Sequence, residues 1–219
     1  MKGKFITIEG LDGAGKSTQI NYMKSYLEKK GFKVLLTREP GGTNIGEKIR
    51  DIVLDKAHAE MDSVTEALLY AASRAQHVSQ VIMPALTRGE IVLCDRFVDS
   101  SMVYQGRGRN LGFDAVKAVN DFATRGLEPN LTLLFNINPD TSLKRINERG
   151  PGDRLEEEKP QFHFSVHKAY MDLAQRFTNR IKVINASQGI EDIRKEVEDI
   201  LEKLIKEGEI HEVSNRNCT

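Results

Sequence analysis

Cysteine is scarce in this sequence, which has only Cys94 and Cys218 in 219 residues. Two cysteines are too few for a disulfide scaffold, and the apolar run IVLC around Cys94 predicts that this thiol is buried. No stretch approaches the roughly 18 apolar residues that a membrane-spanning helix needs. The start, MKGKFITIEG, lacks the long apolar core of a signal peptide. We therefore expect a cytoplasmic protein without a membrane partner.

Net charge is also absent, because 32 Lys and Arg residues balance 32 Asp and Glu residues. A balanced chain has no electrostatic footprint for nucleic acid, so no nucleic-acid partner is expected. A small anionic ligand remains allowed, since it needs only a local cluster of arginines. The composition, with 39% hydrophobic and 29% charged residues, is typical of a globular protein with a sizeable core.

Five short apolar, β-prone runs are present, and segments with helical spacing separate them. The runs start near Phe5, Lys33, Ile91, Leu131 and Ile181. Strands that are apolar throughout and alternate with helices indicate a parallel sheet covered on both faces. The sequence therefore predicts an α/β fold in three layers, with a doubly wound, five-stranded parallel sheet. Without a linker or repeat, residues 1–219 are interpreted as a single domain.

The segment that begins at SVTE predicts the longest helix, because Ser63 and Glu66 have capping-box spacing. An apolar stripe follows it at intervals of three or four residues: Leu68, Ala71, Ala75, Val78, Ile82 and Ala85. Packing against the sheet is the first interpretation of this stripe, and a subunit interface is the alternative. A final amphipathic helix is expected over 190–206, with a frayed end over 207–219.

Residues 10–18, GLDGAGKST, fit the pattern Gly-x-x-x-x-Gly-Lys-Ser of a phosphate-binding loop. The match follows a predicted strand and opens a predicted helix, which is the order that the motif requires. We expect Lys16 to reach the β- and γ-phosphates and the Ser17 hydroxyl to ligate Mg²⁺. The expected ATP-binding residues are Gly10, Leu11, Asp12, Gly13, Ala14, Gly15, Lys16, Ser17 and Thr18.

The strand IVLC is followed by Asp95 and Arg96. Asp95 is a candidate Mg²⁺ ligand, directly or through water. Arg96 cannot be a general base, because a guanidinium stays protonated in proteins. It can clamp a phosphate with two hydrogen bonds, although a surface salt bridge is the alternative. The pair favours a site that holds a second phosphate over one that activates water.

Three further features contain residues suited to nucleotide binding. TREPGG ends the second predicted strand, where doubly wound sheets bind ligands, and Arg50 follows soon after. Tyr70 and Arg74 are one turn apart on the long helix, so they share a face. ERGPGDRLEEE, within about 148–160, contains arginines and glycines between two helices. It is interpreted either as a mobile lid that stabilises charge during phosphoryl transfer or as an ordinary connection.

The motifs together resemble those of the bacterial thymidylate kinases, which are P-loop nucleoside monophosphate kinases. The resemblance covers roughly residues 4–206 and rests on IEGLDGAGKST, TREPGGT, LLYAASRAQH, DRFVDSSMVYQG, PNLTLLFNI and ERGPGDRLE. It implies a P-loop NTPase-type fold, transfer of the γ-phosphoryl group from ATP–Mg²⁺ to dTMP to give dTDP, and a homodimer. The alternatives are a kinase of a related nucleotide such as dUMP, and an ATP-dependent switch without an acceptor.

The resemblance also implies the role of each residue. Asp12 would contact the sugar or organise the phosphate of dTMP, Arg96 and Arg50 would hold that phosphate, and Tyr70 would stack on thymine. Arg74 would bond the edge of the base. The implied dTMP-binding set is Asp12, Glu39, Pro40, Arg50, Tyr70, Arg74, Arg96, Ser101, Gln105 and Tyr170.

The phosphate loop contains no arginine, and in such relatives lid arginines supply the catalytic cation. Arg149 and Arg154 are the candidates, and Arg154 is preferred because it precedes the acidic LEEE. With Lys16, Arg96 and Asp12 they form the expected catalytic set. The stretch PQFHFSVHKAY departs from the family pattern, because His167 stands where an arginine is frequent.

Overall fold

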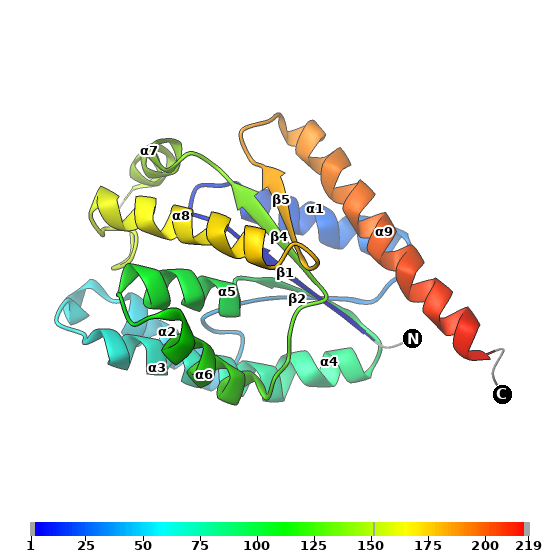
Figure 1. The fold of residues 1–219 in the computed structure, drawn as a ribbon, viewed down its shortest axis with the longest axis horizontal. Coiled ribbons are helices and arrows are strands. Elements are labelled where there is room, and N and C mark those ends of the chain that lie inside the picture. The colour runs from blue at the N-terminus through cyan, green and yellow to red at the C-terminus, as the bar shows by residue number, and fades with distance from the viewer. Residues whose placement is uncertain (1–2, 151, 217–219) are drawn as a thin grey trace.

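A parallel sheet forms the centre of the molecule in the computed structural model, which describes residues 3–150 and 152–216. Its strands are β1 (Lys4–Glu9), β2 (Val34–Arg38), β3 (Ile91–Asp95), β4 (Leu131–Asn136) and β5 (Ile181–Asn185). They lie in the order β2-β3-β1-β4-β5, and every neighbouring pair is parallel (Figure 1). The predicted five-stranded, doubly wound sheet is confirmed. Because the strand order reverses beside β1, the loops that follow β1 and β3 border the crevice where such sheets bind ligands.

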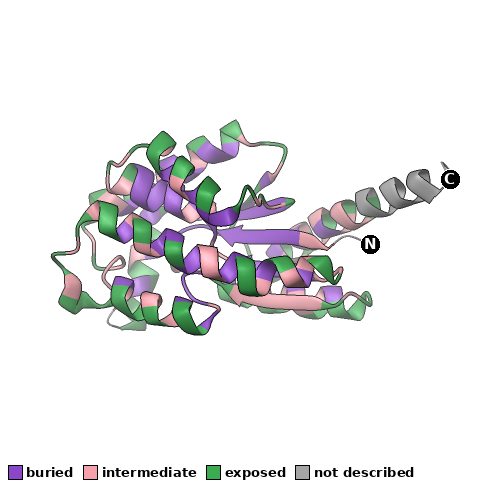
Figure 2. Cartoon of the chain, turned by 90° about the horizontal axis from the view of Figure 1, so that it is seen from below, coloured by how far each residue is buried: buried purple, intermediate pink, exposed green. Residues whose placement is uncertain are grey.

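Helices connect the strands and cover the sheet. They are α1 (Lys16–Lys29), α2 (Asn44–Leu54), α3 (Ser63–His77), α4 (Met83–Thr87), α5 (Val98–Ser101), α6 (Phe113–Thr124), α7 (Pro139–Arg149), α8 (Pro160–Arg176) and α9 (Ile190–Arg216). A 3₁₀ turn (Lys56–His58) follows α2, and π-helical segments follow α3 (Val78–Ile82) and α5 (Met102–Gly108). The three central strands β1, β3 and β4 are mostly buried, whereas the helices in Figure 2 expose their outer faces.

Alternating side chains of the central strands enter two different cores, because successive residues of a strand point to opposite faces. On β1, Ile6 and Ile8 belong to the larger core with residues of α1, α8 and α9. Phe5 belongs instead to a smaller core with the segment that contains Val78 and Ile82. The sheet is therefore covered on both faces, as the three-layer prediction requires.

The predicted apolar stripe divides into two parts. Val78, Ile82 and Ala85 pack against the sheet in the smaller core, whereas Leu68 on α3 is 52% exposed. The capping prediction is wrong by one residue, because Asp62 caps α3 and its carboxylate accepts hydrogen bonds from the amides of Val64 and Thr65. The stripe also crosses a π-helical segment, so α3 ends at His77 and is shorter than α9.

The last helix is longer than expected, since α9 continues past the predicted end at Lys206 to Arg216. Of the segment for which a frayed end is expected, residues 217–219 lie outside the described residues, as does Cys218. Cys94 is fully buried, as predicted. Within residues 3–150 and 152–216, no helix combines the length and apolar character that crossing a bilayer requires.

Candidate functional site

The phosphate-binding loop leaves the carboxyl end of β1 and opens α1. Gly10, Gly13 and Gly15 have positive φ angles of 132°, 75° and 82°, a region that favours glycine. A Cβ at Gly10 would lie 2.4 Å from the backbone oxygen of Phe135, so a side chain cannot fit there. This geometry gives the strand–loop–helix arrangement that the motif predicts, with the N-terminus of α1 directed at the loop.

Lys16 is buried and folds back over this loop. Its Nζ donates hydrogen bonds of 3.0 Å to the backbone oxygens of both Gly10 and Leu11. The same ammonium lies 3.7 Å from Asp12 Oδ1. Burial and the nearby charge of Arg96 lower the pKa of Lys16. A cation of this kind has few solvent contacts and is suited to bind phosphate oxygens.

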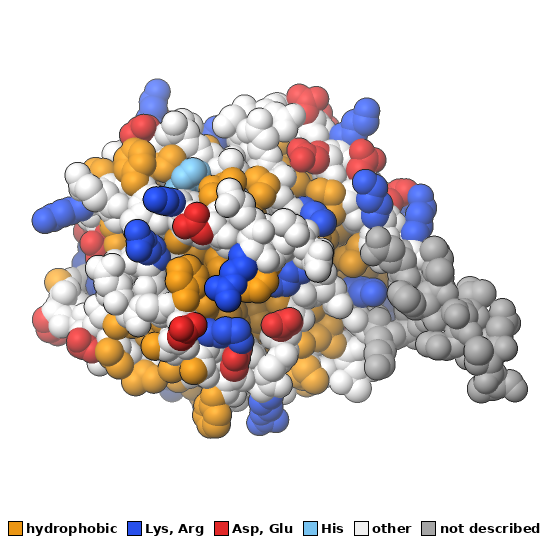
Figure 3. Space-filling model, in the orientation of Figure 1, with side chains coloured by type: hydrophobic (Ala, Val, Ile, Leu, Met, Phe, Trp, Pro, Cys, Tyr) orange, Lys and Arg blue, Asp and Glu red, His pale blue; other side chains and the backbone are white. Residues whose placement is uncertain are grey.

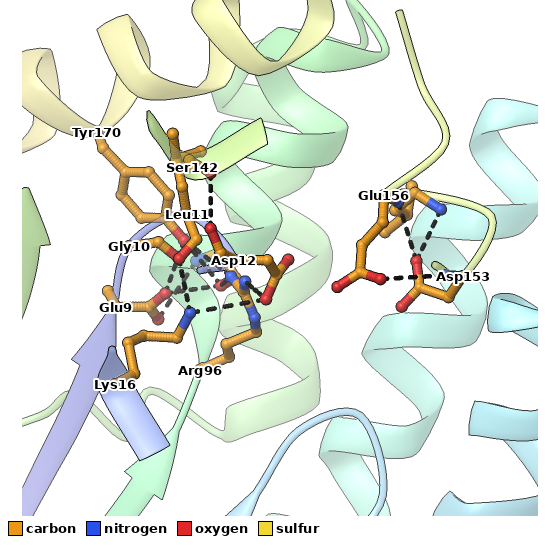
Figure 4. Close-up of polar contacts among 12 residues, drawn as sticks. Glu9, Gly10, Leu11, Asp12, Lys16, Arg96, Ser142, Asp153, Glu156 and Tyr170 are labelled. Carbon is orange, nitrogen blue, oxygen red and sulfur yellow. Dashed lines mark hydrogen bonds and ion pairs between the residues drawn. The ribbon is translucent and has the colours of Figure 1, made fainter. Parts of the chain in front are cut away.

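Arg96 follows β3 and meets Asp12 beside the loop (Figure 4). Its Nη2 donates a 2.8 Å hydrogen bond to Asp12 Oδ1, while Nη1 lies 3.1 Å from Ser100 Oγ and 3.4 Å from Tyr170 Oη. Burial acts to raise the pKa of Asp12, but the charges of Arg96 and Lys16 outweigh burial and hold that pKa below its usual range. The cluster brings three of the predicted catalytic residues together and places Tyr170 next to them.

A cleft of about 270 Å³ opens beside this cluster. It lies at the carboxyl ends of β2 and β3, between the phosphate loop and the lid segment. On the face of the molecule drawn in Figure 3, basic and acidic side chains lie side by side. The cleft is lined by Asp12, Arg38, Glu39, Pro40, Arg50, Leu54, Tyr70, Asp95, Arg96, Ser100, Ser101, Tyr104, Gln105, Arg149, Asp153, Leu155 and Glu156.

Most of the predicted acceptor residues therefore lie in one place. Tyr70 is buried in the cleft wall, and this burial raises the pKa of its hydroxyl. Arg50 Nη1 donates a 3.0 Å hydrogen bond to the backbone oxygen of Pro40. Burial and the neighbouring charge of Arg38 lower the pKa of Arg50. The cleft thus combines an aromatic wall with a group of cations, as a nucleotide site requires.

Arg74 is an exception to the prediction, because it does not line the cleft. Its Nε donates to Glu39 Oε2 at 2.7 Å, and Nη1 donates to Ser101 Oγ at 3.0 Å and to Asn120 Oδ1. Nη2 donates to the backbone oxygen of Phe97 at 3.0 Å. A guanidinium that is fully buried must find acceptors inside the protein. All three guanidinium nitrogens of Arg74 thus contact acceptors of the protein, and the expected hydrogen bond from Arg74 to the edge of the base stays a prediction.

Glu39 also contacts His77, whose Nδ1 lies 2.9 Å from Glu39 Oε1. Glu39, His77 and Cys94 are buried and hold their donor atoms within 4.8 Å of one another, a spacing that could suit a metal. Both carboxylate oxygens are already engaged, one by His77 and one by Arg74. The second imidazole nitrogen is 2.7 Å from Thr37 Oγ1. The group is therefore interpreted as a hydrogen-bonded wall and not as a metal centre.

The two lid arginines occupy different places. Arg149 is 61% exposed, lines the cleft and pairs with Glu156. Arg154 is only 9% exposed, and its Nη2 lies 2.7 Å from Glu66 Oε2 on α3. Its Nε also donates to the backbone oxygen of Val53 at 3.0 Å. The structure does not support the preference for Arg154, because a buried carboxylate from α3 binds it away from the cleft.

The predicted metal ligands are Asp95, in the cleft wall, and Ser17, exposed in the first turn of α1. Among the described residues, no hydrogen-bond partner reaches the buried Oδ1 of Asp95. Such an orphan oxygen needs a partner, and a hard cation can provide it. Carboxylate and hydroxyl oxygens are also the ligand type that Mg²⁺ prefers, so the donor set fits this ion.

Sequence reasoning missed several residues of the site. Glu9 ends β1, is fully buried and accepts hydrogen bonds from Ser100 and Tyr170. From α7, Ser142 Oγ donates to the backbone oxygen of Asp12 at 2.6 Å, and Arg145 Nη1 donates to that of Gly13 at 2.9 Å. The acid that ends the apolar run FITIEG is a signal that could have identified Glu9. No local pattern marks the α7 residues.

Comparisons with a family model, with curated proteins and with solved structures all find thymidylate kinases. The thymidylate kinase family model matches residues 8–197. The chain is 51% identical over 195 residues to a thymidylate kinase of Geobacillus sp., covering 88% of this chain and 93% of that protein. It is 48% identical over 212 residues to that of Bacillus licheniformis, covering 96% and 100%. A crystal structure of thymidylate kinase from Ehrlichia chaffeensis superposes with a TM-score of 0.73 at 29% identity, covering 92% of this chain and 99% of that one.

Proposed function

Because the chain belongs to the thymidylate kinase family, we propose a role for each part of its cleft in the reaction of that family. The protein is an ATP-dependent kinase that moves the γ-phosphoryl group of ATP to dTMP and forms dTDP. The observation that carries the assignment of roles is the position of Arg96. It pairs with Asp12 beside the phosphate loop, where a second phosphate would face the first.

The donor half of the site is the loop from Gly10 to Thr18. Its backbone N–H groups would surround the phosphates of ATP, and Lys16 would move from its own loop onto the β- and γ-oxygens. The hydrogen bonds from Ser142 and Arg145 to backbone oxygens of the loop support this role, because they hold the loop's shape from α7.

The acceptor half is the cleft. Arg96 and Arg50 would hold the phosphate of dTMP, and Tyr70 would stack on thymine, with Ser101 and Gln105 along the base and sugar. Glu39 and Pro40 shape the wall, and Asp12 organises Arg96. Tyr170 supports Arg96 from behind.

The chemistry needs little from a general base, because phosphoryl transfer depends on positioning and on stabilising charge. Arg149 is the cation that the lid offers to the cleft, so we assign it to the transferring phosphoryl group. Asp95 and Ser17 would hold Mg²⁺, which neutralises charge on the β- and γ-phosphates when bound. The lid, about 148–160, and the rest of the chain form one catalytic domain in this proposal.

We further propose a cytoplasmic homodimer that joins through α3 and α6. These helices expose apolar side chains, with Val64 and Leu68 on α3 and Phe122 on α6. Phe122 is 89% exposed, an unfavourable position for an aromatic ring in water. The scarcity of cysteine and the buried thiol of Cys94 suit a reducing compartment.

The test is an acceptor series with ATP–Mg²⁺ and dTMP, dUMP, dGMP or no acceptor, scored for ADP release. Rapid turnover with dTMP, and much slower turnover with the others, is expected. Equal rates with dUMP or dGMP would contradict a site built around thymine, and equal ADP release without an acceptor would indicate an ATPase. Residue 96, beside Asp95, is an arginine and not an acid that could position water, which argues against an ATPase.

A further inference from the structure

We infer that Glu9 is a positioning residue for Arg96. Its carboxylate hydrogen-bonds to the backbone of the turn that follows Arg96. It also orients the Arg96 guanidinium through the hydroxyls of Ser100 and Tyr170. The inference rests on the proposed function, in which Arg96 receives the phosphate of dTMP. It deepens that proposal by naming the group that keeps the cation aligned before the phosphate arrives.

The first contact of Glu9 is with the backbone after Arg96. Oε1 accepts a 2.8 Å hydrogen bond from the amide of Phe97 and a 3.4 Å one from the amide of Ser100. Arg96 itself has φ 68°, in the left-handed region that side chains rarely adopt. Such a conformation persists only where its surroundings hold it in place. Glu9 supplies that restraint by binding the very next amide.

The second contact is with the hydroxyls of Ser100 and Tyr170, and Figure 4 shows Tyr170 beside Glu9. Glu9 Oε2 accepts hydrogen bonds from Ser100 Oγ at 2.6 Å and from Tyr170 Oη at 2.8 Å. Above its raised pKa the Glu9 carboxylate is ionised and can only accept, so it draws the hydrogens of both hydroxyls toward itself. Their lone pairs are then left to accept from Arg96 Nη1, at 3.1 and 3.4 Å. The carboxylate thereby determines which atom donates and which accepts in each hydrogen bond between Glu9 and Arg96.

Burial makes a purely structural role for Glu9 a poor explanation. Its side chain is fully buried, and within the described parts of the chain no Lys, Arg or His nitrogen forms an ion pair with it. Burying a carboxylate without a cation in direct contact is costly, and an apolar residue would fill the same space more favourably. Burial and the neighbouring charge of Asp99 also raise the pKa of Glu9. A costly buried acid whose partner Ser100 lines the cleft is characteristic of a functional position.

The test compares dTMP with thymidine, which has the same base and sugar but no phosphate. Dissociation constants for both are measured by calorimetry on the full-length wild type and on Glu9→Gln. The glutamine amide donates where Glu9 accepts, so it turns the hydroxyl hydrogens toward Arg96 and displaces the guanidinium. We expect dTMP affinity to fall about tenfold, the scale of losing one hydrogen bond to a charged group, while thymidine affinity stays unchanged. Ser100→Ala should shift the dTMP-to-thymidine ratio in the same direction and serves if Glu9→Gln does not fold.

Arg96→Gln and the double variant Glu9→Gln/Arg96→Gln complete the experiment. Once Arg96 is gone, removing Glu9 should cause no further loss of phosphate-specific affinity. An equal loss of dTMP and thymidine in Glu9→Gln, or an additive loss in the double variant, would overturn the inference. If Arg96→Gln lowers the ratio and neither Glu9→Gln nor Ser100→Ala does, the inference fails while the proposed function stands. If Arg96→Gln leaves the ratio unchanged, the assignment of Arg96 itself fails.

Discussion

Asp12 Oδ1 lies 2.8 Å from Arg96 Nη2, so the carboxylate of the phosphate loop holds the cation that follows β3. The two residues join the ends of neighbouring strands and connect the donor loop to the acceptor cleft. Arg96 also contacts the Glu9–Ser100–Tyr170 group through Nη1, which restrains both arms of its guanidinium. Positioning of this kind before binding lowers the ordering cost that a substrate phosphate must overcome.

Arg149, and not Arg154, is expected to act on the transferring group. Arg149→Ala should lower the single-turnover rate by about 10²–10³-fold if it acts as arginine fingers do, with little change in dTMP affinity. Arg154→Ala removes a lid contact with Glu66 and should mainly weaken substrate binding. Rapid-quench single-turnover rates on both variants check this. A steep loss of rate in Arg154→Ala alone would show that the lid rearranges to bring that residue into the cleft.

Arg74→Ala should destabilise the fold, because it leaves the buried carboxylate of Glu39 without its cation. Losses of about 3–5 kcal/mol are typical when one partner of a buried ion pair is removed. Arg88→Ala is the matched control, since Arg88 pairs with Glu90 but is 57% exposed, so its removal should leave the stability nearly unchanged. Urea unfolding of the two variants measures the difference. Near-native stability in Arg74→Ala, together with a selective loss of dTMP binding, would instead show that Arg74 contacts the base directly.

Stability should depend on pH through Glu9, whose pKa burial and the charge of Asp99 raise from 4.5 to about 7. In this range the folded chain retains a proton that the unfolded chain releases, so the free energy of unfolding falls as the pH rises. The difference between wild type and Glu9→Gln isolates this group from the surrounding Arg96, Lys16 and Tyr170. Relative to the variant, the wild type should lose up to about 3 kcal/mol between about pH 4.5 and pH 7. A difference that stays constant with pH would mean that Glu9 titrates normally.

Phe122→Asp should convert the proposed homodimer to a monomer. A charge on this 89%-exposed ring would have to be buried in an apolar interface, which is costly. Sedimentation velocity gives the mass directly, and Phe164→Asp, on α8, is a control that should leave the mass of a dimer unchanged. If the wild type sediments as a monomer, the proposed homodimer is contradicted.

The sheet and the phosphate loop could be predicted because their signals are local. Apolar runs show each strand, and the glycines of residues 10–15 have the positive φ angles that the loop needs. The protein partners of Arg74 and Arg154 could not be predicted, because helical spacing and flanking acids do not show which distant carboxylate binds a guanidinium. Glu39 and Glu66 bind them from other elements.

Glu9 was missed for the same reason. Its partners Ser100 and Tyr170 lie 91 and 161 residues away in the sequence, and only the folded sheet brings them together. The helix cap at Asp62 is a smaller case, since Asp62 and Ser63 are both good capping residues and the sequence alone does not separate them.

The most direct test of the account follows the γ-phosphoryl group itself. ATP labelled in the γ-phosphate is mixed with excess enzyme, Mg²⁺ and dTMP, and the products are separated within one turnover. If the cleft beside Arg96 holds the acceptor, the label should appear in dTDP, with little inorganic phosphate and little reaction when dTMP is left out. Label that appears as inorganic phosphate at the same rate with or without dTMP would show that water is the acceptor and would contradict the account.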